Sequence, residues 1–143
     1  MEHQTGEADY QRVVDSYKVA GFNNVRVEKF IYDMDRAFRE AHLVVCRAGA
    51  SSLAELAAAG KAAVLIPLVS KDRHQEHNAV EIEHVGGALS RLQGSLTGES
   101  LAAILKDLYN NPERIQSLAH QMGKLHHPNA AHAIAQSILA KQA

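Results

Sequence analysis

The sequence predicts an α/β protein with a doubly wound parallel sheet. Three short apolar runs, at 25–31, 43–46 and 63–67, have the length and the β-branched composition of buried strands. Helical spacing of apolar residues fills the segments between them. Short apolar strands that alternate with helices are typical of a parallel sheet covered on both faces, with right-handed crossovers.

Both crossovers between these strands are predicted to be helices. Residues 33–41 repeat apolar side chains at helical spacing, and residues 52–59 form a second helix that ends at Gly60. A loop of small residues, 47–50, precedes the second helix. Two strand–helix–strand steps therefore follow one another along the chain.

The rest of the chain is predicted to be mostly helical. A helix over about 75–85 leads to a weak strand over 88–90, and the pattern is helical from Thr97 onward. Residues 3–6 look like the end of a strand and its turn, with the strand itself absent. Because no repeat or linker interrupts the sequence, we expect residues 1–143 to be a single, partial domain.

Composition excludes several classes of function. With 15 basic and 16 acidic side chains and a formal net charge of -1, the chain has no basic surface for nucleic acid or an anionic membrane. The single cysteine, Cys46, excludes an internal disulfide, fits a reducing compartment and reads as a buried strand residue rather than a nucleophile. The longest apolar run, 62–69, contains Pro67 and is too short to span a bilayer. We therefore expect a cytoplasmic protein.

Ligands of an open parallel sheet gather outside the carboxyl ends of its strands, which here are the loops after Ile31, Cys46 and Pro67. In the loop after Cys46, Gly49 and Ala50 let a ligand approach the backbone closely. The helix that follows offers unpaired N–H groups and its positive dipole end to a phosphate. The sequence therefore predicts a pyrophosphate site in this loop.

A capping box is the alternative for the same loop. Ser52 and Glu55 have the Ser-x-x-Glu spacing with which two side chains bond the free N–H groups of a first helical turn. In that case the two residues only complete the helix and bind no ligand. The sequence alone leaves both interpretations open.

A second polar constellation, residues 72–79, follows the third strand. Gln75 and Asn78 lie three residues apart on one helical face, so both amides can hydrogen-bond the hydroxyls of a sugar. The alternative is an ordinary solvated helix start. His74 and His77 have the spacing of a metal chelate, but no Cys or Asp cluster completes a site, so no metal is expected.

Together these residues resemble the C-terminal domain of the MurG family, the inverting glycosyltransferases that add N-acetylglucosamine from UDP-N-acetylglucosamine to lipid I and so make lipid II in peptidoglycan synthesis. The motifs that carry the resemblance occur in order and at family-like spacing at 3–6, 30–34, 45–55, Gly60, Pro67 and 72–79. The resemblance implies a Rossmann-like domain, the C-terminal half of a GT-B glycosyltransferase.

The resemblance also implies which residues bind the donor. They are Ile31 for the uracil, Gly49, Ala50, Ser51 and Ser52 for the phosphates and sugar, Glu55 for the ribose, and His74, Gln75 and Asn78 for the N-acetylglucosamine hydroxyls. It implies no catalytic residue, metal or cofactor within this chain.

The sequence departs from the family at its start. The family's C-terminal domain begins with a strand and a glycine-rich Gly-Gly-Ser loop, and neither precedes His3 here. The N-terminal domain, with the acceptor site, the general base and the membrane-docking surface, is missing as well. We therefore expect a donor-binding part that is inactive alone, whereas the full-length family is peripheral on the cytoplasmic face of the bacterial inner membrane.

The sequence alone leaves other interpretations of the whole chain open. The strands near Val25 and Leu43, which would flank the absent strand, present exposed edges through which the chain can form a homo-oligomer. The chain can also be a non-catalytic donor-binding or assembly subunit that needs a separate acceptor-binding chain. A folding fragment without function is the third interpretation.

Overall fold

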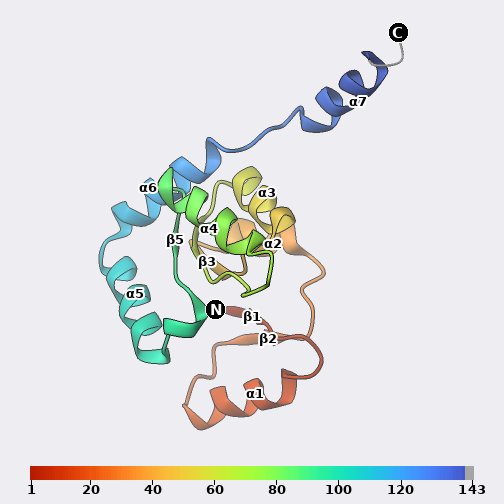
Figure 1. The fold of residues 1–143 in the computed structure, drawn as a ribbon. Coiled ribbons are helices and arrows are strands. Elements are labelled where there is room, and N and C mark those ends of the chain that lie inside the picture. The colour runs from red at the N-terminus through yellow and green to blue at the C-terminus, as the bar shows by residue number, and fades with distance from the viewer. Residues whose placement is uncertain (141–143) are drawn as a thin grey trace. The chain divides into compact units, whose positions relative to one another are not determined.

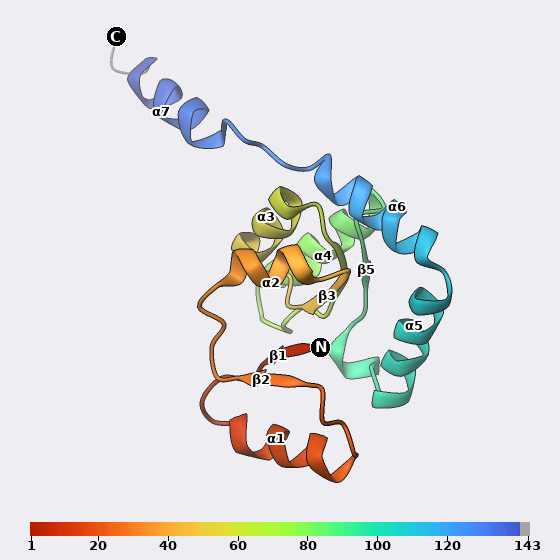
Figure 2. The same cartoon turned by 180° about the vertical axis from the view of Figure 1, so that it is seen from behind.

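The computed structural model describes residues 1–140, which form two compact units, Met1–Glu40 and the part from Ala41 onward (Figures 1 and 2). Each unit has its own parallel sheet and its own helices. The predicted α/β class and the parallel pairing are confirmed, although the strands form two sheets rather than one. The single partial domain over 1–143 stays a prediction.

The first unit contains a two-stranded sheet and two helices. Its elements are β1 (Glu2–Gln4), α1 (Tyr10–Val19), β2 (Arg26–Glu28) and α2 (Met34–Glu40). β1 pairs with β2 in parallel, with His3 opposite Val27. The strand end and turn predicted at residues 3–6 are therefore present, with β1 as a strand of only three residues. A strand of only three polar or charged residues gives no periodic signal, and its partner strand defines it.

An ion cluster ties β1, β2 and α2 together. Arg36 donates from Nη2 to Glu2 Oε1 at 2.8 Å and from Nη1 to Glu40 Oε2 at 2.9 Å, and Arg26 Nη1 lies 3.5 Å from Glu2 Oε1. The hydrogen bond from Arg36 lowers the pKa of Glu2; the charges of Arg36 and Arg26 add to this effect, and partial burial opposes it.

Glu2→Gln is expected to destabilise the first unit by about 0.5–1 kcal/mol at neutral pH, the range for a partly exposed ion pair. Because folding lowers the pKa of Glu2, its contribution is complete above the ordinary value of 4.5 and disappears as the pH falls through the lower folded value. Wild type and variant should therefore converge in stability in acid. Urea denaturation at neutral and acid pH, followed by amide exchange of β2, measures both effects.

Glu7→Gln is the matched control for this cluster. Glu7 pairs with Lys29, but both side chains are exposed, at 79% and 50%, so its removal should leave stability unchanged. A loss for Glu2→Gln that is the same at both pH values would contradict the electrostatic explanation.

The second unit is built around a three-stranded parallel sheet in the order β3-β4-β5. Its elements are β3 (Leu43–Cys46), α3 (Ala50–Ala59), β4 (Ala62–Leu65), α4 (His74–His84), β5 (Ala88–Ser90), the 3-10 turn η1 (Gln93–Ser95), α5 (Gly98–Asn110), α6 (Pro112–Gly123) and α7 (Ala130–Ala140). The predicted strands and helices of this part are therefore confirmed, with bounds that shift by one or two residues.

The core of this unit surrounds β4. All four residues of β4 are fully buried, as expected for a central strand without polar alternation. α6 packs against β4 and α3, and α4 packs against β5. The largest fully buried side chains are Leu56, Leu65, Leu108, Met122, Val64 and Pro67. A rigid sheet with well-packed helices therefore carries the loops at its carboxyl edge.

Gly60 ends α3 as the sequence predicts. Its φ of 58° lies in the left-handed region, where a side chain is strained. The turn lets the N–H of Gly60 bond to Ala57 O and the N–H of Lys61 bond to Leu56 O, which satisfies the last carbonyls of the helix. The chain then enters β4 directly.

Candidate functional site

The loop after β3 leads directly into α3. Gly49 is the N-cap, with extended backbone (φ -68°, ψ 146°), and no side chain caps the helix. The first backbone bond of the helix runs from Leu53 N–H to Gly49 O at 3.0 Å. The capping-box alternative is therefore wrong, because Ser52 and Glu55 both lie inside a helix that begins at Ala50. The sequence did not reveal that the glycine itself takes the cap position.

Three of the predicted residues of α3 face outward. Ala50, Ser51 and Glu55 are exposed, and Ser52 is half-buried. Glu55 has no hydrogen bond or ion pair with any residue in the described part of the chain. Its carboxylate is therefore available to a ligand.

The start of α4 holds the other predicted side chains. Asn78 is half-buried and donates from Nδ2 to Ala48 O at 3.1 Å. Gln75, also half-buried, accepts from Leu68 N–H at Oε1, at 3.0 Å. The interpretation of an ordinary solvated helix start therefore does not describe these two residues. It does describe His74, which is exposed.

The structure thus brings together the two polar loops of the second unit, which are the loop between β3 and α3 and the loop between β4 and α4. Asn78 belongs to α4, yet it bonds the fully buried Ala48 in the loop after β3. Gln75 closes the loop between β4 and α4 onto the helix that follows it. Both loops lie at the carboxyl ends of neighbouring parallel strands, as predicted.

Ile31 lies in the first unit, apart from the two loops of the second unit in the sequence. Its N–H donates to Gln4 Oε1 at 2.8 Å, so Gln4 fixes the backbone at this position. The predicted contact of Ile31 with a uracil stays a prediction.

Charged groups around the start of α4 are paired locally. Arg73 donates from Nε and Nη2 to Oε2 of Glu76, the one buried acidic residue in the described chain, at 3.0 and 2.8 Å. Arg73 has a φ of 53°, in the left-handed region. The Ser70 hydroxyl donates to Asp72 at 2.5 Å and lowers the pKa of that carboxyl, to which the nearby His74 adds.

Cys46 lies at the end of β3, where its side chain is half-buried. Its burial raises the pKa of the thiol to about 11, so the thiolate is scarce at neutral pH. The strand itself is only half-buried, so the predicted buried strand is confirmed as a strand but not as a buried one. Within residues 1–140 no group of three His, Cys, Asp or Glu side chains is placed to hold a metal ion.

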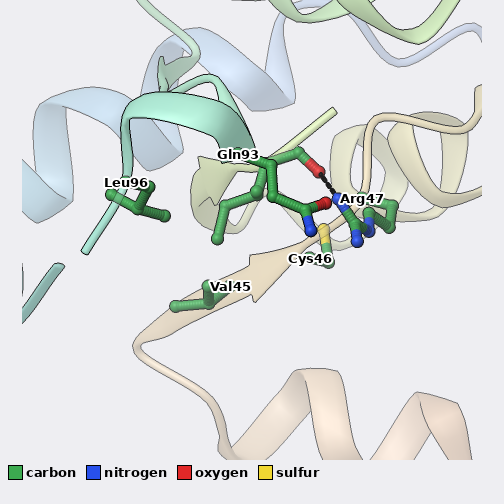
Figure 3. A pocket seen from close by; sticks show the side chains of 6 residues that line it. Val45, Cys46, Arg47, Gln93 and Leu96 are labelled. Carbon is green, nitrogen blue, oxygen red and sulfur yellow. Dashed lines mark hydrogen bonds between the residues drawn. The ribbon is translucent and has the colours of Figure 1, made fainter. Parts of the chain in front are cut away.

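A shallow hollow of about 350 Å³ lies at the same edge of the sheet (Figure 3). It is lined by Val45, Cys46, Arg47, Ile66, Gln93 and Leu96. None of the predicted donor residues lines it, but Arg47 and Ile66 belong to the two polar loops. Sequence reasoning did not single out Arg47, although it lies in the 45–55 motif, nor Gln93, which belongs to no motif. Figure 3 shows that Arg47 reaches a backbone oxygen across this space.

No helix among the described residues has both the length and the apolar character that a membrane span needs. This result agrees with the short apolar runs of the sequence.

Comparison with known proteins identifies the family. The sequence profile described as "Glycosyltransferase family 28 C-terminal domain" matches residues 1–134. The UDP-N-acetylglucosamine--N-acetylmuramyl-(pentapeptide) pyrophosphoryl-undecaprenol N-acetylglucosamine transferase of Myxococcus xanthus is 43% identical over 134 residues, which cover 93% of this chain and 35% of that protein. The protein of the same name from Syntrophotalea carbinolica is 47% identical over 118 residues, which cover 82% and 33%.

A solved structure supports the same assignment. The crystal structure of Acinetobacter baumannii MurG matches with a TM-score of 0.84 and 31% identity, over 97% of this chain and 40% of that chain. The chain thus spans about a third of the length of the curated relatives that it matches. The resemblance to the C-terminal domain of the MurG family is confirmed, and the chain belongs to the glycosyltransferase family 28 C-terminal domain family.

Proposed function

We propose that this chain is the donor-binding part of a glycosyltransferase that transfers N-acetylglucosamine from UDP-N-acetylglucosamine to lipid I to form lipid II. The observation that carries the proposal is that two of the predicted donor-binding side chains order both polar loops: Asn78 connects the loop after β3 to α4, and Gln75 fixes the loop between β4 and α4. The names of the relatives support the substrate pair, because they describe an N-acetylglucosamine transferase that acts on a pyrophosphoryl-undecaprenol.

The free atoms of these amides suit a sugar. The hydrogen bond from Leu68 uses Gln75 Oε1 and leaves the Nε2 donor, whereas the bond to Ala48 uses Asn78 Nδ2 and leaves the Oδ1 acceptor. A sugar hydroxyl both donates and accepts, so one donor and one acceptor on the same helix complement it. In this proposal the exposed His74 adds a further contact at the edge.

The first turn of α3 suits a diphosphate. The N–H groups of Ala50, Ser51 and Ser52 precede the first bond of the helix, which Leu53 makes to Gly49. No side-chain cap occupies them. An anion placed there gains from these N–H groups and from the helix dipole. We place Glu55, one turn further along the same helix, against the ribose hydroxyls, and we keep the contact of the Ile31 backbone with the uracil as a separate proposal for the first unit.

The acceptor chemistry is proposed to lie outside this chain. An inverting displacement needs a general base that removes the proton of the acceptor hydroxyl. Gln75 and Asn78, which we place at the donor sugar, carry amides that are too weakly basic for this role. We therefore propose that a separate acceptor-binding domain supplies the base, the lipid site and the contact with the cytoplasmic face of the membrane.

Donor binding is the direct test. Calorimetry and ligand-observed NMR of the 143-residue chain with UDP-N-acetylglucosamine are expected to detect binding, weaker than in a complete enzyme because one side of the donor stays in solvent. UDP should bind with part of that affinity, and ADP-glucose is the control that shares a diphosphate and a hexose but not the base. The absence of any interaction at millimolar UDP-N-acetylglucosamine would contradict the proposal.

A further inference from the structure

Arg47, which is outside the predicted donor residues, connects the two polar loops. It is the first residue after β3, and its Nη1 donates to Ile66 O at 3.0 Å and to Pro67 O at 3.3 Å. These carbonyls follow the end of β4, where the backbone bond from Ile66 N–H to Cys46 O, at 2.8 Å, closes the connection between the strands. The guanidinium therefore extends this connection beyond the sheet (Figure 3).

The peptide unit between Pro67 and Leu68 links Arg47 to Gln75. The carbonyl of Pro67 and the N–H of Leu68 belong to one rigid, planar peptide group. Arg47 holds the carbonyl side of that plane, and Gln75 Oε1 accepts from its N–H side at 3.0 Å. The orientation of the Gln75 amide therefore depends on the orientation of a peptide that Arg47 holds.

The guanidinium of Arg47 bonds the two backbone carbonyls and forms no ion pair with any described residue. Its side chain has no carboxylate partner in the described part of the chain, unlike Arg73 and Arg91, which pair with Glu76 and Glu83. Hydrogen bonds from a charged donor are stronger than neutral ones, so two carbonyl contacts can hold a loop at the surface. On the other side, Asn78 ties α4 to Ala48, the neighbour of Arg47.

We propose that Arg47 is a positioning residue for the donor sugar. It does not touch the donor; it holds the Pro67–Leu68 peptide and so directs the free Nε2 of Gln75 toward the sugar. The inference rests on the proposed function for its ligand, but the contact between Arg47 and the loop can be tested without any ligand.

Arg47→Met removes the guanidinium group that donates the two hydrogen bonds and keeps the apolar part of the side chain. We expect the Kd for UDP-N-acetylglucosamine to rise about tenfold, the effect of one well-oriented hydrogen bond, while the Kd for UDP changes by less than about twofold. In the free protein, amide exchange of Leu68 should become faster, because its acceptor is no longer held in place. Arg47→Lys, whose ammonium can still reach both carbonyls, should restore slow exchange and most of the sugar-dependent affinity.

Arg91→Met is the matched control, since Arg91 directly follows β5 and also donates to a carbonyl, that of Ser90. It should change neither the Leu68 exchange rate nor the ratio of the two Kd values. An equal loss of affinity for UDP and UDP-N-acetylglucosamine in Arg47→Met would mean a direct phosphate contact and would overturn the proposal. Unchanged Leu68 exchange would overturn it too. A wild-type chain that binds neither nucleotide would refute the proposed function, and Leu68 exchange would then decide on the contact alone.

Discussion

Leu65→Ala is expected to lower the free energy of unfolding of the second unit by about 2–5 kcal/mol, the range for truncation of a buried leucine. Leu65 ends β4 and is fully buried, in the same core as Leu56 and Met122. Its removal leaves a cavity between a central strand and its covering helices, and neither side can close around it without disturbing the other. The backbone of Leu65 also accepts a bond from Arg91 N–H, so any shift of β4 is passed on to β5.

Urea denaturation followed by hydrogen exchange of the β4 amides measures this loss, because these amides exchange only when the sheet opens. Leu92→Ala is the control: its side chain is 49% exposed, and its truncation should cost less than about 1 kcal/mol. A similar loss for both variants would show that the core does not surround β4 as described.

The sequence predicted those parts of the fold that short stretches of residues specify by themselves, such as an apolar run or a glycine that ends a helix. β3 and β4 are runs of apolar residues, and Gly60 marks the end of α3 because only glycine takes its φ of 58° without strain. β1 lacks such a signal, since its polar residues form a strand only through pairing with β2. α1 was not predicted, although Tyr10, Val13 and Val14 have helical spacing, because the helix buries no residue completely.

The site was predicted in its residue types and only partly in its contacts. The amides at 75 and 78 were expected to share a face, and the structure places both against backbone groups of neighbouring loops. The role of Ser52 at a helix start was misjudged, since the backbone of Gly49 takes the cap position without any side chain. Arg47 could not be predicted, because its two carbonyl acceptors lie 19 and 20 residues further along the chain and meet it only through strand pairing.

Glu55→Ala is expected to weaken UDP binding by about 1–3 kcal/mol, because a carboxylate that accepts the ribose hydroxyls makes charge-assisted hydrogen bonds. The stability of α3 should hardly change. Glu55 is exposed, has no partner in the described residues and does not cap the helix, and alanine is at least as good a helix former. Calorimetry with UDP, together with thermal denaturation, separates binding from stability. Glu81→Ala, at an exposed site of α4, is the matched control and should affect neither.

A second ligand assigns the loss to the ribose. If Glu55 binds the ribose hydroxyls, 2′,3′-dideoxyuridine diphosphate should bind the wild-type chain about as weakly as UDP binds Glu55→Ala. The two changes combined should then cost little more than either one alone, because both remove the same hydrogen bonds. Losses that add in full would mean that Glu55 acts elsewhere on the nucleotide. A loss of thermal stability without any loss of affinity would mean that this carboxylate supports the helix and not the ligand.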